Sequence, residues 1–239
     1  SILMPGVVHM RHTHLPEHKF VKGQPETGKE LADDLERIAL NFGSENIAAC
    51  IVEPISGSTG TLVPPKGYLN RLREICDKHD ILLIFDEVIT GWGRTGSSFA
   101  SKEYGVTPDL MTMAKATTNG IVPMGVVAVK EEIYDTIVNA SPDGVIELFH
   151  GYTYSGIPVA VAAALAVQDI FEKEDIFNRA KSLSSYFLDG LFSLKDIKCI
   201  ENIRGYGLMG GIDIKKSDRP GKAGFLTYKK CYEAGVNFK

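Results

Sequence analysis

Residues 81–86 read Ile-Leu-Leu-Ile-Phe-Asp, a run of five apolar side chains that ends in a carboxylate. Residues 110–115 read Leu-Met-Thr-Met-Ala-Lys and place an amine at the end of a similar run. Short apolar runs of this length predict buried strands, as in a parallel sheet covered by helices. Ligands of such sheets bind at the carboxyl ends of the strands. Asp86 and Lys115 are therefore expected to meet at one edge and to serve a ligand there.

The rest of the chain alternates between strand and helix patterns. Apolar residues at helical spacing predict helices over about 28–43, 67–79, 157–173 and 175–194, a short helix near 98–104, and a last helix that begins near Ala223. Apolar runs predict further strands over 48–52, 126–129 and 207–214. Strands that alternate with helices are typical of an α/β fold with a mostly parallel sheet flanked by helices.

Composition excludes several classes of protein. The chain has 239 residues, 44% of them hydrophobic, and a net charge of -4. It can build a core, and its charge offers nothing to nucleic acid or to an anionic membrane surface. We expect no membrane span, because no apolar stretch approaches the roughly 20 residues required. The N-terminus lacks a signal-peptide pattern, and the four widely spaced cysteines are expected to be reduced core thiols of a cytoplasmic protein.

An acid and a lysine at one sheet edge suit pyridoxal 5'-phosphate (PLP), which needs a lysine for its aldehyde and an acid for its pyridinium nitrogen. Burial of Lys115 would favour the neutral amine that forms a Schiff base and moves protons. If the strand continued past Asp86, Val88 would share its face and pack on a flat ring, with Glu87 opposite. The alternatives are that Asp86 caps a loop and Lys115 is a solvated surface residue. Lys130, which precedes two glutamates, is instead typical of a solvated helix start.

Residues 91–96, Gly-Trp-Gly-Arg-Thr-Gly, spell the dinucleotide-binding pattern GxGxxG. A Rossmann unit also needs a long helix directly after the glycines and an acid at the end of the next strand. Here the predicted helix is short, the next strand ends in Lys115, and the nearest acid, Asp109, precedes that strand. NAD binding is therefore the less favoured hypothesis.

Two further polar clusters have a plain and a functional interpretation. His9, His12, His14 and His18 lie on an irregular segment without acids or cysteines at ligand spacing, so we expect surface or interface histidines and no metal. The loop 150–156 is either an ordinary helix start or a phosphate site, in which Thr153 would act with backbone N–H groups near a helix N-terminus.

Four segments, taken in order, resemble the class III (omega) aminotransferases of PLP fold type I: Val52–Pro54, Phe85–Gly96, Met113–Gly120 and Gly151–Gly156. Within that family the opening residues are similar to the omega-amino acid:pyruvate (beta-alanine:pyruvate) branch; these are Leu3–Val7 and Arg11–Pro16. The resemblance covers nearly the whole chain. It implies a homodimer that moves an amino group from an omega-amino acid or amine to a keto acid such as pyruvate by a ping-pong mechanism.

The resemblance also implies a role for each matching residue. Lys115 would hold PLP as a Schiff base, Asp86 would pair with the pyridine nitrogen, and Val88 would lie on the ring. Thr153 would bind the phosphate of the neighbouring subunit's cofactor. Glu53 would join the polar network of the site and pair with an arginine. The alternatives are an aminomutase or decarboxylase of the same fold, or an inactive truncated fragment that only dimerises.

Three departures from the family pattern stand out. Ile89 replaces a glutamine that touches the ring in many members, and Ile157 replaces a histidine. Family members are also longer, so we expect a chain truncated at both ends. It would hold a partial PLP-binding large domain over 1–165, then a linker helix and part of a smaller α+β domain over 166–239.

Overall fold

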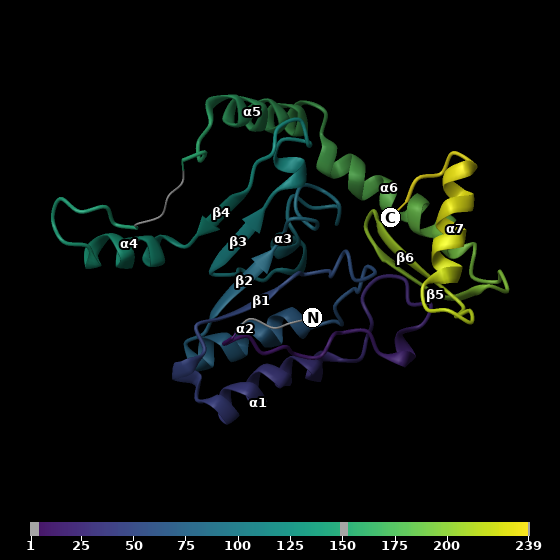
Figure 1. The fold of residues 1–239 in the computed structure, drawn as a ribbon, viewed down its shortest axis with the longest axis horizontal. Coiled ribbons are helices and arrows are strands. Elements are labelled where there is room, and N and C mark those ends of the chain that lie inside the picture. Colours follow the sequence, from purple (N-terminus) through teal and green to yellow (C-terminus); the bar gives the residue numbers. More distant parts are fainter. Residues whose placement is uncertain (1–4, 149–152, 239) are drawn as a thin grey trace.

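The computed structural model describes residues 5–148 and 153–238. Its central sheet has the order β1-β2-β3-β4, formed by β1 (Ala49–Val52), β2 (Leu82–Asp86), β3 (Leu110–Met113) and β4 (Val126–Val129). The first three strands run parallel, and β4 pairs antiparallel with β3 (Figure 1). The predicted mostly parallel sheet is therefore confirmed.

One face of this sheet is covered by α1 (Asp33–Phe42) and α2 (Tyr68–His79) (Figure 1). Leu83 and Phe85 of β2 point into this interface and are fully buried. Each such side chain contributes about 1.5–3 kcal/mol on burial. The other face is open within the described residues, since Ile51 and Val127 are each 62% exposed. The expectation of fully buried strands is therefore wrong for that face.

The remaining elements follow the sheet along the chain: α3 (Ala100–Tyr104), α4 (Glu131–Ala140), α5 (Pro158–Lys173), α6 (Ile176–Phe192), β5 (Ile200–Tyr206), β6 (Met209–Ile214) and α7 (Lys222–Glu233). Short 3-10 helices are η1 (Pro16–His18), η2 (Lys29–Ala32), η3 (Ser44–Asn46) and η4 (Lys115–Thr117). Figure 1 shows α4 reaching away from the sheet and α6 leading to a second, antiparallel sheet of β5 and β6. In the described ranges, none of the helices combines the length and apolar character needed to cross a membrane.

The second sheet packs on loops that follow β1 and β2. The Arg204 guanidinium donates to Asp213 at 2.6 and 2.9 Å and to the Gly60 carbonyl at 2.6 Å. Gly207 lies so close to the next loop that a Cβ there would be 2.5 Å from the Arg94 carbonyl oxygen, and its φ is +59°. Glycine is required here for both reasons. The small sheet thus braces the loops at the carboxyl edge of the large one.

Candidate active site

The three parallel strands end at the same edge, which brings together residues that are far apart in sequence. Glu53 follows β1, Asp86 ends β2, and Lys115 lies just after β3. The register pairs Asp86 with Thr112. One strand spacing across and three residues along put the α-carbon of Lys115 within about 11 Å of that of Asp86. The predicted acid and amine therefore lie at one edge of the sheet.

Asp86 turns the chain instead of continuing the strand. Its Oδ1 accepts the Val88 N–H at 3.0 Å, the pattern of an Asx turn. The prediction of a strand running on through Val88 is wrong, because the short carboxylate captures the N–H two residues ahead. Asp86 is half-buried, and its Oδ2 makes no hydrogen bond within the described residues. That oxygen is therefore available to a ligand.

Glu87 points the other way and is fully buried. Its carboxylate accepts hydrogen bonds from Thr90 Oγ1 at 2.7 Å, from Ala100 N at 2.8 Å and from Ser101 N at 2.7 Å. These bonds tie the start of α3 to the end of β2. A buried carboxylate without hydrogen-bond partners is unfavourable, so these three donors must stay in place. Glu87 thereby fixes the loop between β2 and α3.

Lys115 begins η4 with φ of +47°, a left-handed conformation that is rare outside glycine. Its side chain is exposed and forms no ion pair or hydrogen bond with any described residue. The expected burial is therefore wrong for the described residues, because the sheet face beside it is open. The turn itself is ordered, since the Gly120 N–H donates to the Lys115 carbonyl at 3.2 Å.

Lys130 and Asp109 lie at the opposite end of β3 and are fully partnered. The Asp109 carboxylate is contacted by the Lys130 amine at 2.7 Å and by the Arg73 guanidinium at 2.7 Å. Leu83 N also donates to Asp109 at 2.6 Å. Burial opposes ionisation of this carboxyl, but these donors outweigh it and hold the pKa of Asp109 below its usual value. α4 begins at Glu131, directly after Lys130, as its sequence indicated.

Two of the three glycines of residues 91–96 pack against α6. A Cβ at Gly93 would lie 3.1 Å from the Phe177 ring, and one at Gly96 would lie 3.4 Å from the Lys181 backbone. The next helix, α3, has only five residues. A dinucleotide site would need a long helix starting at these glycines, so the local structure does not fit the NAD hypothesis.

Thr153 is not brought to the Asp86 edge. It lies exposed in the turn before α5, while Gly151 and Tyr152 of the same predicted loop fall outside the described residues. Phe171, near the other end of α5, stacks on Trp92 at 5.7 Å in the loop after Asp86. The helix rises about 20 Å between Pro158 and Phe171. Thr153 is therefore at the far end of α5 from that loop.

Glu53 is half-buried and caps its own loop, where Oε2 accepts the Gly57 N–H at 2.9 Å. It forms no ion pair with an arginine within residues 5–148 and 153–238, unlike the pairing that the resemblance implies.

The predicted exposure of the histidines fails at one position. His18 is buried, and its Nε2 lies 2.9 Å from the Thr27 carbonyl oxygen, so it is a core residue. Among the described residues no three His, Cys, Asp or Glu side chains gather as a metal site would need. Cys50 and Cys76 are buried thiols as predicted, whereas Cys199 is exposed. All four cysteines are unpaired.

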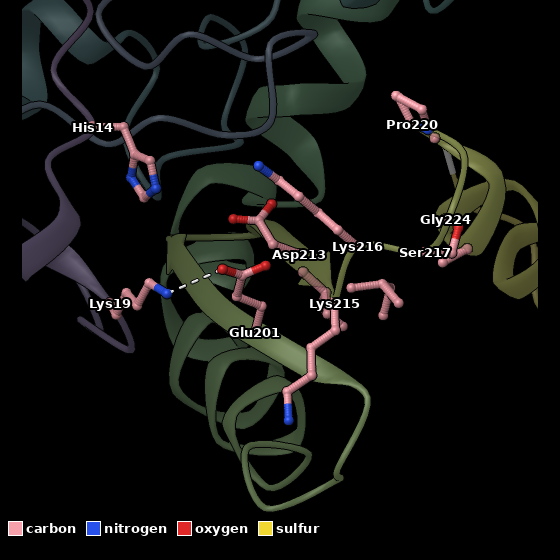
Figure 2. A pocket seen from close by; sticks show the side chains of 13 residues that line it. His14, Lys19, Glu201, Asp213, Lys215, Lys216, Ser217, Pro220 and Gly224 are labelled. Atoms are coloured by element: carbon pink, nitrogen blue, oxygen red, sulfur yellow. Dashed lines mark hydrogen bonds and ion pairs between the residues drawn. The ribbon is translucent and has the colours of Figure 1, made fainter.

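A separate cleft of about 550 Å³ lies between the N-terminal segment and the connection from β6 to α7 (Figure 2). Figure 2 shows Lys19 pointing at Glu201, with which it pairs at 3.2 Å. Asp213, in the same cleft, is neutralised by Arg204. His14 lines it too, and burial lowers the pKa of this imidazole. The cleft contains none of the residues predicted to act in chemistry.

The sequence and the fold were compared with known proteins. The family model described as Aminotransferase class-III matches residues 3–239. An omega-aminotransferase of Caulobacter vibrioides is 51% identical over 236 residues, which cover 98% of this chain and 54% of the relative. A beta-alanine--pyruvate aminotransferase of Pseudomonas aeruginosa is 48% identical over 233 residues, which cover 95% of this chain and 52% of the relative. The chain thus spans about half the length of these curated relatives.

Solved structures give the same match. The omega transaminase of Pseudomonas jessenii in complex with PMP superposes with a TM-score of 0.88 and 31% identity, covering 99% of this chain and 54% of that one. An (S)-enantioselective omega-transaminase of Thermomicrobium roseum has a TM-score of 0.82 and 39% identity, covering 88% of this chain and 48% of that one. The fold is thus that of PLP-dependent transaminases of fold type I.

Proposed function

The chain belongs to the class III aminotransferases, and on that premise we propose that it carries out PLP-dependent amino transfer. The donor would be an omega-amino acid or amine, and the acceptor a keto acid such as pyruvate. One observation supports this most: Asp86 and Lys115 lie at the same edge of the sheet, and neither Asp86 Oδ2 nor the Lys115 amine has a partner among residues 5–148 and 153–238. The names of the relatives, omega-aminotransferase and beta-alanine--pyruvate aminotransferase, support the substrate class.

The residues present fit the cofactor. When bound, PLP supplies an electron-poor ring that accepts electron density from the substrate carbon. Asp86 Oδ2 would hold a proton on the ring nitrogen, and Val88, whose backbone N–H donates to the other oxygen of that carboxylate, would lie on the ring. Lys115 Nζ would bind the cofactor covalently and, once displaced by the substrate amine, would move the proton at the substrate carbon as base and then acid.

Ile89 does not replace the ring contact of a glutamine. A Cβ at Gly57 would lie 2.5 Å from Ile89 Cδ1, so this side chain packs on the loop after β1. Its side chain carries no hydrogen-bond donor or acceptor. A hydrogen bond to the phenolic oxygen of the cofactor ring would therefore have to come from another residue.

We propose that Thr153 serves the cofactor of a second copy in a homodimer. Its distance along α5 from the Asp86 loop supports this, as does the exposed apolar surface of that helix, where Val159 is 61% and Leu165 63% exposed. A second copy would remove such surface from water. Sedimentation at increasing concentration tests the dimer, and a monomer at all concentrations would contradict it.

Two coarser proposals concern organisation and location. We propose a large cofactor-binding unit over 1–165 and a linker helix with part of a small domain over 166–239. The separate second sheet supports this, although α5 is continuous across the boundary. We also propose a cytoplasmic location, supported by four unpaired thiols.

The function is tested by supplying PLP, beta-alanine and pyruvate to the protein and following both substrates by chromatography. We expect one alanine formed for each beta-alanine consumed, no turnover with Lys115→Ala, and retained turnover with the matched variant Lys130→Ala. Loss of carbon dioxide from the donor would favour a decarboxylase, and alanine formed from beta-alanine without consumption of pyruvate would favour an aminomutase. Dimerisation without PLP binding would favour the inactive fragment.

A further inference from the structure

Trp92 connects the loop after Asp86 to the turn that holds Lys115. It lies inside the glycine-rich segment, in a left-handed conformation with φ of +63°. Its backbone N–H donates to the Ser98 carbonyl at 2.6 Å. The indole ring is held on two sides, by Phe99 at 4.9 Å edge-on and by Phe171 at 5.7 Å in a stack. These contacts fix the direction in which the indole N–H points.

That N–H donates to Thr117 Oγ1 at 3.0 Å. An indole nitrogen can only donate, so the threonine oxygen accepts and its own proton is free for another partner. The Thr117 hydroxyl donates to the Ala114 carbonyl at 3.0 Å, and the Thr117 N–H reaches the same carbonyl at 3.0 Å. Thr117 is buried, at 3% exposed. We call the path from the Trp92 indole through the Thr117 hydroxyl to the Ala114 carbonyl the relay. It holds Ala114, just before Lys115, and Thr117, two residues after it.

The backbone of the Lys115 turn has a conformation that its surroundings must hold in place. Its backbone has φ of +47°, and Asn119 in the same turn has φ of +52°. Residues with side chains stay in this region only when the surrounding structure holds them there. The side chain of Lys115 itself contacts no described partner, so the hold comes from the backbone on either side.

We propose that Trp92 is a positioning residue that, through Thr117, sets the placement of Lys115 relative to Asp86. The hydrogen bond from Trp92 to Thr117 joins the Asp86 loop directly to the Lys115 turn, and α5 also packs on both. This inference rests on the proposed function for the roles of the two ends, while the relay itself is a property of the chain without cofactor.

The test uses Trp92→Phe, which keeps an aromatic ring between Phe99 and Phe171 but removes the N–H donor. Thr117→Val removes the acceptor at nearly equal volume, and Thr117→Ser keeps the hydroxyl. Amide hydrogen exchange without PLP is expected to rise roughly 3- to 10-fold over residues 114–120 in Trp92→Phe, the effect of losing one neutral hydrogen bond. It should rise at least as much in Thr117→Val, which also loses the hydrogen bond to the Ala114 carbonyl. Thr117→Ser should restore protection, and Trp92→Phe combined with Thr117→Val should be no worse than Thr117→Val alone.

A second readout uses PLP. The rate at which borohydride traps the cofactor on Lys115 should fall in Trp92→Phe and Thr117→Val and recover in Thr117→Ser. Trp92 is the only tryptophan, so its emission in Thr117→Val should shift as the indole loses its partner. Phe99→Leu removes one of the two ring contacts that orient the indole but keeps its N–H, and should raise exchange at 114–120 less than Trp92→Phe does.

The outcomes separate this inference from the proposed function. If the wild-type chain traps no PLP at Lys115, the proposed function fails, and exchange still decides whether the relay holds the turn. If wild type traps PLP while Trp92→Phe matches it in both trapping rate and exchange, the inference is overturned. A uniform rise in exchange over all helices together with a lower urea midpoint would also overturn it, because that pattern indicates a general loss of stability.

Discussion

The two ends of β3 hold the same kinds of side chain in opposite states. At its amino end, Asp109 and Lys130 contact each other at 2.7 Å, and Arg73 and Leu83 complete the set. At the carboxyl edge, neither the second oxygen of Asp86 nor the amine of Lys115 has a partner in the part of the chain that the structure describes, and Lys115 has an uncommon backbone conformation. An acid and a lysine that neutralise each other stabilise the fold, whereas a separated pair at a ligand-binding edge is free to act on a small molecule.

The largest expected effect of breaking this contrast is at Asp86. Asp86→Asn keeps the shape but removes the charge that would face the ring nitrogen. We expect the rate of amino transfer to fall roughly 10²- to 10³-fold, the scale of losing one electrostatic partner of the reacting group. The matched variant Asp109→Asn should keep the rate per folded molecule. Similar rates in wild type and Asp86→Asn would contradict the role of this carboxylate.

Asp109→Asn should instead lower the free energy of unfolding. The change leaves Arg73 and Lys130 without their shared acid in a mostly buried position. We expect a loss of about 3 kcal/mol, the lower part of the range for breaking a buried ion pair. Urea unfolding followed by circular dichroism measures it, with Asp86→Asn as the comparison. Equal urea midpoints for Asp109→Asn and Asp86→Asn would contradict the stabilising role of the Asp109 ion pairs.

The same carboxyl predicts a dependence of stability on pH. The pKa of Asp109 is held below its usual value in the folded state. Its contribution is therefore present above the unfolded pKa of about 3.9 and is lost as the pH falls through the folded pKa. The stability difference between wild type and Asp109→Asn should be largest near neutral pH and shrink below about pH 4. Urea midpoints from pH 3 to 7 give this difference, and a constant gap would contradict it.

The smallest effect is expected at Lys130, whose side chain is 38% exposed. Lys130→Ala should cost about 0.5–1 kcal/mol of unfolding free energy, since exposed ion pairs contribute little. The loss should diminish in high salt, because the pair is partly screened. A loss for Lys130→Ala that stays the same in low and high salt would indicate that Lys130 acts by packing alone.

Much of the fold could be predicted, because apolar runs and helical spacing mark strands and helices directly. β5 was missed, since Asn202 and Arg204 are buried polar residues that interrupt its apolar pattern. The partner of Asn202, the Phe20 N–H, is remote in sequence and could not be foreseen, whereas Asp213, the partner of Arg204, lies on the next strand of the hairpin. The sequence of β1 could not predict the open face of the sheet either, because the burial of Ile51 depends on which other segments pack on that face.

At the site, the strand-end positions of Asp86 and Lys115 were predictable, while the geometry beyond them was not. In the Asx turn, the Asp86 side chain accepts the Val88 N–H that a continued strand would use in the sheet. The alternation of apolar and polar residues does not indicate such a bond. Trp92 and Thr117 were missed because the glycine pattern around Trp92 suggested a dinucleotide loop. A lone tryptophan in a glycine-rich segment was the available signal.

The central claim is that Lys115, and not the paired Lys130, is the lysine that binds the cofactor. The direct measurement is to incubate the protein with PLP, reduce with borohydride, digest, and locate the pyridoxyl group by mass spectrometry. We predict a single dominant site at Lys115 that disappears in Lys115→Ala and persists in Lys130→Ala. Modification of Lys130 or of exposed lysines in general, with Lys115 unmodified, would contradict the account.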